Sequence, residues 1–458
     1  GIKVRIDQLG RIRDSEILVS PLMVFSGESG LGKSYLALLC HYFFELLINT
    51  SRLNHFFVDN NIDFNILAKD FKDVGTALEI KKQDLEAWMA KDAILYLRYM
   101  LGYDGISGQI EITLPESIPD TMAFTYKNEL TGLVDKEEIY TILSLGNLRF
   151  RIQEKTQFDE SPFAFLLRFV LIDYIFGNYQ MLDSTFVLPP SRGPILTEQI
   201  IPTTGMYLEF LNDMTGLNRI KPRPDTASEI VLKLFRTILE GEVNKEETTY
   251  IYTTNDASMP VSAAAASIRE IAPLQILAKK QDVSRCAILV EEPEAHLHPL
   301  KQRMMADIIG ALSHNGAIMQ ITTHSDYFLR RLNELIMFAK AKKTTDDPDK
   351  LRTLSEKVNI VEDMSIDESI IGAYLLRKQA DNTSIAVKQD ISNGIPFAAF
   401  RDAILDNMNY QDILEFWFSA EAQPNWFAKS AEFDAIIRKN FAGLLRSAAQ
   451  AELWRWRN

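Results

Sequence analysis

The sequence contains 458 residues, of which 47% are hydrophobic and 24% charged, with a formal net charge of −13. This composition is typical of a globular chain with one large core or two to three domains. The acidic balance argues against a protein that coats nucleic acid over its whole surface, although it leaves room for a local basic groove. Cys40 and Cys286 lie in apolar runs, and no apolar run is long enough to cross a bilayer. We therefore expect buried thiols in a cytoplasmic protein without a membrane anchor.

The first predicted elements lead into a phosphate-binding loop. Alternating apolar and polar residues predict a hairpin at 2–19, and apolar runs predict a strand at 22–25 and a buried helix at 35–48. The loop between them matches the pattern G-x-x-x-x-G-K-[ST] and consists of Gly27, Glu28, Ser29, Gly30, Leu31, Gly32, Lys33 and Ser34. Glycines allow consecutive N–H groups to face phosphate oxygens, and the helix start adds its positive dipole end. With Lys33 on the outer phosphates and Ser34 on Mg²⁺, the loop predicts binding of a nucleoside triphosphate.

The residues after this loop predict an inserted segment at 51–190. Its first part, 51–101, is mostly helical in pattern, and 84–100 is the clearest helix. The apolar period changes to two at 108–153, which predicts a small antiparallel β lobe, and a buried helix follows at 162–177.

Further elements are predicted beyond the insertion. They are a strand at 185–188, a helix at 225–239, a β-rich run at 248–253 and a charged surface loop at 340–350. Arg192 follows the first of these strands, and it contacts either the nucleotide or a partner, or else it forms a structural ion pair.

Two apolar strands supply the other predicted site residues. The strand at 286–290 ends in Glu291 and Glu292, and a buried parallel strand that delivers acids at its C-terminal edge is typical of a Walker B motif. The strand at 318–323 ends at His324, where a neutral imidazole can bridge the γ-phosphate and a water. The alternatives are solvated glutamates and a structural histidine. His296 and His298 lack further ligands at zinc spacing, so we interpret them as a turn into a helix near Pro299.

These segments resemble the ABC-type ATPases of the SMC/OLD superfamily. The similarity is most specific to stand-alone bacterial and archaeal "AAA" ATPases that accompany nucleases or toxins in phage defence, and it extends over most of residues 2–408. It is carried by the sequences GESGLGKS, AILVEEPEAHLHP, ITTHSDYFLRRLN and LPPSRG. The resemblance implies an α/β fold: an ABC-type P-loop ATPase head at residues 1–408, with a mixed sheet and the inserted β lobe.

The resemblance also implies roles for individual residues. Glu291 would support Mg²⁺, Glu292 would activate the attacking water because it is the acid just before the proline, and His324 would sense the γ-phosphate. In such proteins two heads sandwich two ATP molecules, so ATP and Mg²⁺ are the expected cofactors and a homodimer or higher homo-oligomer is the expected assembly.

One segment departs from this family. Where the family has Ser-Ser-Gly before the helix that caps the γ-phosphate of the other head, this chain has Ala265, Ala266 and Ser267. A helix that begins near Ser267 still offers N–H groups and a hydroxyl to an anion, so we include Ser267 among the nucleotide-binding residues. The departure predicts a slow or nucleotide-sensing ATPase.

The last residues, 409–458, predict a small all-α C-terminal module. Four of the five tryptophans lie there, and apolar residues recur at helical spacing. The segment resembles the opening of an uncharacterised bacterial family of TPR-like helical proteins. Because such a unit cannot bury its apolar face alone, we expect that face to pack on its own head, on a second copy or on a continuation of the chain.

The leading hypothesis is thus a Mg²⁺-dependent ATPase that dimerises around ATP and regulates an associated protein effector, a nuclease or toxin, in antiphage defence. One alternative is an ATP-binding assembly scaffold with little hydrolysis. Another is an SMC-like DNA-repair head, which the lack of long heptad arms and of a strongly basic stripe disfavours.

Overall fold

The structure is a computed structural model of the chain. It describes residues 1–62, 74–131, 138–153, 161–176, 182–197, 201–220, 228–247, 249–345, 347–392 and 394–395. The chain divides into two compact units, residues 1–396 and 397–458, and all of the described residues lie in the first. The boundary expected after residue 408 and the helical module expected at 409–458 lie outside the described residues and stay predictions.

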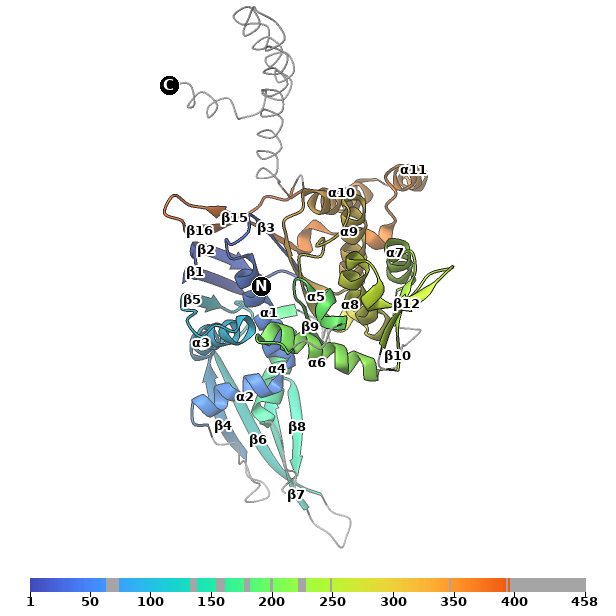
Figure 1. The fold of residues 1–458 in the computed structure, drawn as a ribbon. Helices are drawn as coiled ribbons and strands as arrows, with labels where there is room; N and C mark the ends of the chain where they lie inside the picture. The colour runs from blue at the N-terminus through green and yellow to red at the C-terminus, as the bar shows by residue number, and fades with distance from the viewer. Residues whose placement is uncertain are drawn as a thin grey trace, which may run out of the picture. The chain divides into compact units, whose positions relative to one another are not determined.

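A large mixed sheet forms the centre of the first unit (Figure 1). In the described part of the chain its strand order is β5 (Gly108–Thr113), β1 (Lys3–Leu9), β2 (Ile12–Leu18), β16 (Ser384–Lys388), β15 (Ile371–Lys378), β3 (Leu22–Gly27), β14 (Ile318–Thr323), β13 (Cys286–Glu291) and β9 (Ser184–Leu188). The pairs β15–β3, β3–β14, β14–β13, β13–β9 and β16–β2 are parallel. The pairs β15–β16, β2–β1 and β1–β5 are antiparallel. The predicted α/β class with a mixed sheet is confirmed.

Three strands of this sheet carry the predicted site at their ends. Every residue of β3, β13 and β14 is buried. Because a parallel strand is covered on both faces, it needs a continuous apolar run rather than an alternating one, and this is the pattern that the sequence shows there. The carboxyl ends of the three strands meet at one edge of the sheet, where ligands bind in open α/β sheets.

Helices and short sheets surround this framework. The helices are α1 (Lys33–Ile48), α2 (Thr50–Asp59), α3 (Lys82–Leu101), α4 (Pro162–Phe176), α5 (Arg192–Thr197), α6 (Gly205–Arg219), α7 (Glu229–Leu239), α8 (Ala266–Lys280), α9 (Pro299–His314), α10 (Asp326–Thr344) and α11 (Pro348–Val358). A separate antiparallel sheet pairs β10 (Glu242–Glu246), β11 (Thr249–Thr253) and β12 (Ser258–Pro260).

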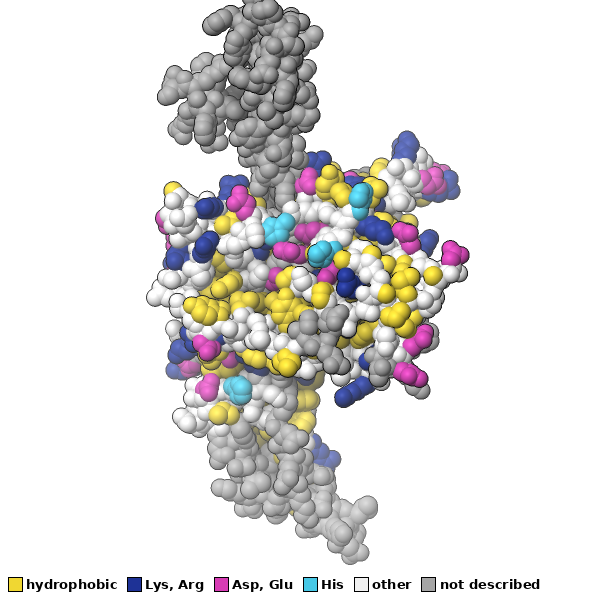
Figure 2. All heavy atoms as spheres, in the orientation of Figure 1, with side chains coloured by type: hydrophobic (Ala, Val, Ile, Leu, Met, Phe, Trp, Pro, Cys, Tyr) yellow, Lys and Arg dark blue, Asp and Glu magenta, His cyan; other side chains and the backbone are white. Residues whose placement is uncertain are grey.

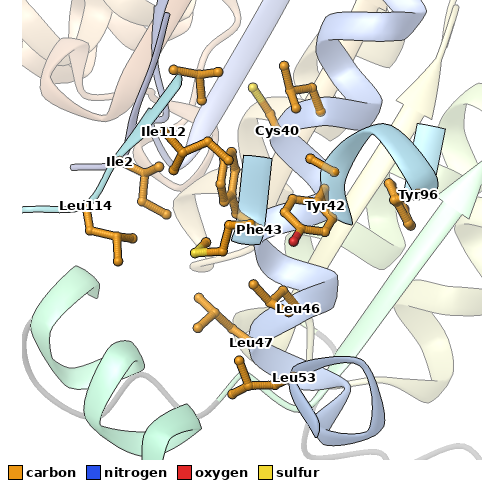
Figure 3. Packing of buried hydrophobic residues seen from close by; sticks show 14 of the residues in the cluster. Ile2, Cys40, Tyr42, Phe43, Leu46, Leu47, Leu53, Tyr96, Ile112 and Leu114 are labelled. Atoms are coloured by element: carbon orange, nitrogen blue, oxygen red, sulfur yellow. The ribbon is translucent and has the colours of Figure 1, made fainter. Parts of the chain in front are cut away.

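Helix α1 is the apolar centre of the largest core. Twelve of its sixteen residues are buried, and it contacts β3, β13 and β14. Figure 3 shows Phe43 and Leu47 of α1 among side chains that include Ile2, Ile112 of β5 and Leu53 of α2. Tyr42 lies towards Tyr96 of α3. A helix that is apolar nearly all round is stable only when several layers cover it, which explains why its sequence lacks a polar face.

The inserted segment forms the predicted lobe, with two corrections. The lobe is the antiparallel sheet β4 (Val74–Lys81), β6 (Thr121–Thr131), β7 (Glu138–Leu145) and β8 (Leu148–Gln153), which lies beside α2 and α4 (Figure 1). The prediction that 51–101 is mostly helical missed β4, whose register is set by pairing with β6 about 45 residues later in the chain. The strand at 108–113, assigned to the lobe, instead pairs with β1 at the edge of the large sheet.

The prediction of a surface loop at 340–350 is wrong. Helix α10 continues to Thr344, and α11 begins at Pro348 with Asp347 as its N-cap, whose carboxylate accepts the N–H groups of Asp349 and Lys350. Charged residues and a proline are as compatible with the end of one helix and the start of the next as with a loop, and here they form two helix termini.

Cys40 and Cys286 are buried free thiols, as predicted. Over the described residues, no helix is both long and apolar enough to cross a membrane.

Candidate functional site

The phosphate loop joins β3 to α1 with its glycines in the left-handed region. Gly27, Gly30 and Gly32 have φ values of 126°, 74° and 104°. A Cβ atom on Gly27 would lie 2.5 Å from the main-chain oxygen of Leu376 on the neighbouring strand β15, so no other residue fits at that position. The loop therefore turns its main chain towards a common centre without side chains in the way, as a phosphate-binding nest requires.

Lys33 is the first residue of α1, and its side chain folds back over the loop. Its Nζ atom donates to the main-chain oxygens of Gly27 (3.0 Å) and Glu28 (2.7 Å). Burial lowers the pKa of Lys33 to about 8, against the opposing effect of the nearby acids, of which Glu292 contributes most. A partly desolvated ammonium group is a stronger partner for an anion than one in bulk water.

Ser34 and Glu291 form a pair beneath the loop. The Ser34 hydroxyl donates to Glu291 Oε2 at 2.8 Å, and Glu291 Oε1 is buried without a hydrogen-bond partner among the described residues. Burial raises the pKa of Glu291 to about 7, partly offset by the bond from Ser34. A hydroxyl and an unsatisfied carboxylate oxygen are the donor set that suits Mg²⁺, which binds through one or two protein groups together with substrate phosphates and waters.

Glu292 and His324 face each other at the ends of β13 and β14. Glu292 has a φ of 46°, and its N–H donates to the main-chain oxygen (3.1 Å) and the hydroxyl (3.2 Å) of Thr322. Its Oε1 lies 3.2 Å from His324 Nε2, and this hydrogen bond lowers the pKa of Glu292. The two side chains remain 38% and 33% exposed, so both can reach a ligand and solvent.

The neighbours of the His324 ring indicate which of its two nitrogen atoms carries the proton. Lys33 Nζ lies 3.5 Å from His324 Nδ1, at the limit of a hydrogen bond, and an ammonium group can only donate. Nδ1 is therefore the acceptor, which leaves the proton of the neutral ring on Nε2, where it donates to Glu292. Lys33, His324 and Glu292 thus form a short polar chain across the site.

Glu294 belongs to the site and was missed by the sequence analysis. Its Oε1 accepts the His324 N–H (2.7 Å) and the Thr323 hydroxyl (2.8 Å), and burial raises its pKa. It therefore fixes the end of β14 from which the His324 ring projects. The signal was present, because Glu294 is the third acid of the Glu-Glu-Pro-Glu run, but its direction depends on the turn after β13.

Lys33, Ser34, Glu292 and His324 line a cleft of about 420 Å³, whereas Glu291 and Glu294 are not among its lining residues. Besides residues of the phosphate loop, its walls contain Glu292, Thr322, His324, Tyr35, Leu101 and the β1–β2 turn at Gly10 and Arg11. The cleft therefore extends from the phosphate loop towards a wall that the sequence analysis did not include. On the face drawn in Figure 2, histidine and acidic side chains gather above a band of apolar ones.

The remaining predicted residues occupy different surroundings. In the loop, Glu28, Ser29 and Gly30 are exposed, whereas the Leu31 side chain is buried in the core. Ser267 is half-buried in the first turn of α8 and does not line the cleft. The helix begins at Ala266 with Ala265 as its N-cap and without a side-chain cap.

Arg192 does not face the cleft. It is 1% exposed, and its guanidinium donates to main-chain oxygens of the surrounding elements, including that of Glu291. Of the interpretations from the sequence, the structural ion pair holds: Arg192 Nε lies 3.8 Å from Oε2 of the buried Glu270 carboxylate, and main-chain oxygens supply the closer contacts.

The sequence matches two family models. Residues 206–329 match the model of an AAA ATPase domain, and this segment contains Glu291, Glu292, Glu294 and His324. Residues 413–458 match a model described as a bacterial protein of unknown function (DUF924). No curated protein matches the chain.

Solved structures of SMC heads are similar to the chain at low identity. An Smc head bound to the C-winged helix domain of ScpA is 9% identical over 85% of this chain and 97% of that chain, with a TM-score of 0.35. The SMC head domain from Thermotoga maritima is 10% identical over 85% and 98%, with a TM-score of 0.31. The Smc head with an extended coiled coil from Pyrococcus furiosus, bound to the C-terminal domain of ScpA, is 9% identical over 89% and 98%, with a TM-score of 0.35. The family match at residues 206–329 and the arrangement of the phosphate loop, the acidic strand end and His324 together support an ATP-binding ATPase.

Proposed function

We propose that this chain is a Mg²⁺-dependent ATPase that pairs with a second copy around ATP and thereby regulates an effector protein. The observation that carries the proposed hydrolysis is the convergence of Lys33, Ser34, Glu291, Glu292 and His324 at one edge of the large sheet. Each of these groups has the surroundings that its proposed role needs.

Lys33 would neutralise the outer phosphates, in place of the loop oxygens that its ammonium group now contacts. Ser34 and Glu291 would hold Mg²⁺, which supplies charge neutralisation at the phosphates when bound. Glu292 would accept a proton from the attacking water, and its lowered pKa keeps it in the basic form that this step requires. His324 would orient that water and the γ-phosphate through Nε2, held in place by Glu294.

Pairing of two copies is supported by the position of Ser267. The first N–H groups of a helix have no partner within that helix, and those of α8 lack a side-chain cap. They offer an anion site outside the chain's own cleft, as expected if they contact the nucleotide of a second copy. The role in antiphage defence and the identity of the effector, a nuclease or a toxin, rest on the family resemblance alone.

The test of this function is phosphate release combined with mass measurement. We expect slow release from ATP that requires Mg²⁺ and stops in EDTA, and a sedimentation shift from one copy to two with a non-hydrolysable ATP analogue. Absence of nucleotide binding would refute the site, and a constant mass in every nucleotide state would refute the pairing.

A second candidate function is an ATP-binding scaffold with little hydrolysis. The observation that favours it is the alanine pair, Ala265 and Ala266, at the start of α8. The same experiment separates the two functions, because a scaffold would bind ATP and change mass without phosphate release above background. Repeating the release assay with DNA tests the third hypothesis, an SMC-like head.

The raised pKa of Glu291 predicts a pH dependence of metal binding. Below a pKa of about 7 the Glu291 carboxylate takes up a proton, and a protonated carboxyl binds Mg²⁺ poorly. The Mg²⁺ concentration for half-maximal binding of a fluorescent ATP analogue should therefore rise about tenfold for each pH unit below 7 and level off as the pH approaches 8. The Glu291→Gln variant should bind Mg²⁺ weakly with a flat profile over this range, and a flat profile in the unmodified protein would contradict the assignment.

A further inference from the structure

Arg192 carries a fully buried charge and bonds to the main chain of three elements next to the site. Its Nη1 donates to the main-chain oxygens of Glu291 (3.0 Å) and Pro189 (3.1 Å), and its Nε donates to that of Glu270 (2.8 Å). Glu291 ends β13, Pro189 follows β9, and Glu270 lies in the second turn of α8. One guanidinium group therefore bonds two neighbouring strand ends and a helix.

Glu270 fixes Arg192 in return. It is buried, and its carboxylate does not pair closely with the guanidinium, since the nearest approach, from Oε2 to Arg192 Nε, is 3.8 Å. Instead, its two oxygens accept the N–H groups of Arg192 (3.1 Å) and Gly193 (3.0 Å) at the start of α5. A Cβ atom on Gly193 would lie 2.8 Å from the Cβ of Arg269, so α5 and α8 are in close contact. The beginnings of α5 and α8 are thus joined through both main chain and side chain.

The contacts of Arg192 reach the main chain of Glu291, the proposed metal ligand. The carbonyl oxygen that Arg192 holds belongs to Glu291, whose carboxylate accepts the bond from Ser34, and the next residue, Glu292, has a positive φ. Positive φ is strained at a glutamate and persists only where the surroundings fix it. Arg192 holds the peptide group at the start of that strained turn.

Resting on the proposed function, we propose that Arg192 is a positioning residue: it holds the Glu291 carboxylate in its metal-binding place and ties it to α8 through Glu270. Arginine is required because its planar guanidinium donates along several fixed directions, whereas a lysine ammonium on a flexible stem cannot reproduce this fork. The helix that begins beside Ser267 and the strand that ends at Glu291 are consequently held as one rigid unit.

The test is the metal affinity of the Arg192→Lys variant, which keeps the positive charge but loses the planar set of donors. We would titrate Mn²⁺, detected by electron paramagnetic resonance, into full-length protein with a non-hydrolysable ATP analogue. Loss of a group that orients a metal ligand weakens metal binding about 10- to 100-fold, and we expect about tenfold here. Affinity for the analogue without metal should stay within about twofold, because the phosphate loop is not touched.

Arg331→Lys is the matched control. Arg331 is also buried and donates to two main-chain oxygens, those of Val358 (3.1 Å) and Asn359 (2.7 Å), but it lies between α9, α10 and the end of α11. Its replacement should lower the melting temperature without moving the Mn²⁺ affinity. Glu270→Gln is the second test variant and decides the question if Arg192→Lys does not fold; we expect a smaller shift in the same direction.

The outcomes separate the two proposals. If Mn²⁺ does not bind the unmodified protein with the analogue, the proposed metal site is wrong, and the positioning role falls with it. If Mn²⁺ binds the unmodified protein, but the folded test variants match it and differ only in melting temperature, Arg192 is merely structural and this inference alone is overturned.

Discussion

Replacing Glu292 with glutamine should lower the rate of ATP hydrolysis about 10²- to 10⁴-fold, the range that a positioned general base contributes. Glutamine has nearly the same shape, and its Oε1 can still accept the bond from His324 Nε2, so the fold and the bound nucleotide should be retained. What it loses is the ability to take a proton from water. ATP-bound pairs should therefore accumulate, which single-turnover phosphate release and sedimentation in ATP would detect.

Glu247→Gln provides the matched control for this experiment. Glu247 is also a glutamate at positive φ, 51°, but it lies in the turn between β10 and β11. Its replacement should leave hydrolysis unchanged. If Glu292→Gln alters neither turnover nor the mass in ATP, Glu292 is not the base and the proposed chemistry is wrong.

Replacing Lys33 with alanine should abolish nucleotide binding at the concentrations that saturate the unmodified protein. Removing one partner of a buried, hydrogen-bonded charge pair costs about 2 to 5 kcal/mol, which corresponds to a loss of affinity of roughly 30-fold or more. The measurement is a calorimetric titration with Mg²⁺ and a non-hydrolysable ATP analogue.

Lys82→Ala is the matched control for Lys33→Ala. Lys82 is the first residue of α3 and donates to the main-chain oxygen of Pro115 (2.9 Å), much as Lys33 begins α1 and donates to loop oxygens. Its loss should affect stability alone. Unchanged binding by the Lys33→Ala variant, with the protein folded, would mean that the loop is not the nucleotide site.

Both expectations depend on features that are contiguous in the sequence. The phosphate loop is a single run from Gly27 to Ser34 between an apolar strand and an apolar helix, and the acids follow an apolar strand directly. Local backbone preferences and the length of the apolar runs are enough to predict such units. The α/β class was implied by the family resemblance, which the same contiguous motifs carry.

The tertiary structure decided everything that depends on pairing between distant segments. The strand at 108–113 lies in the large sheet because it pairs with β1, about a hundred residues earlier, and alternation alone predicts a strand but not its partner. The cleft wall at Gly10 and Arg11 and the hydrogen bond from the His324 N–H to Glu294 also depend on segments that are distant in the sequence.

Arg192 shows this division most clearly. Its sequence context permitted a ligand contact or a structural role, and the structure placed it behind Glu291, bonded to three main-chain oxygens. The sequence by itself determined the strand, loop and acid units of the nucleotide site, because neighbouring residues fix them. Only the tertiary structure decided what orients those units, because a buried polar group takes its partners from whatever the packed chain brings within reach.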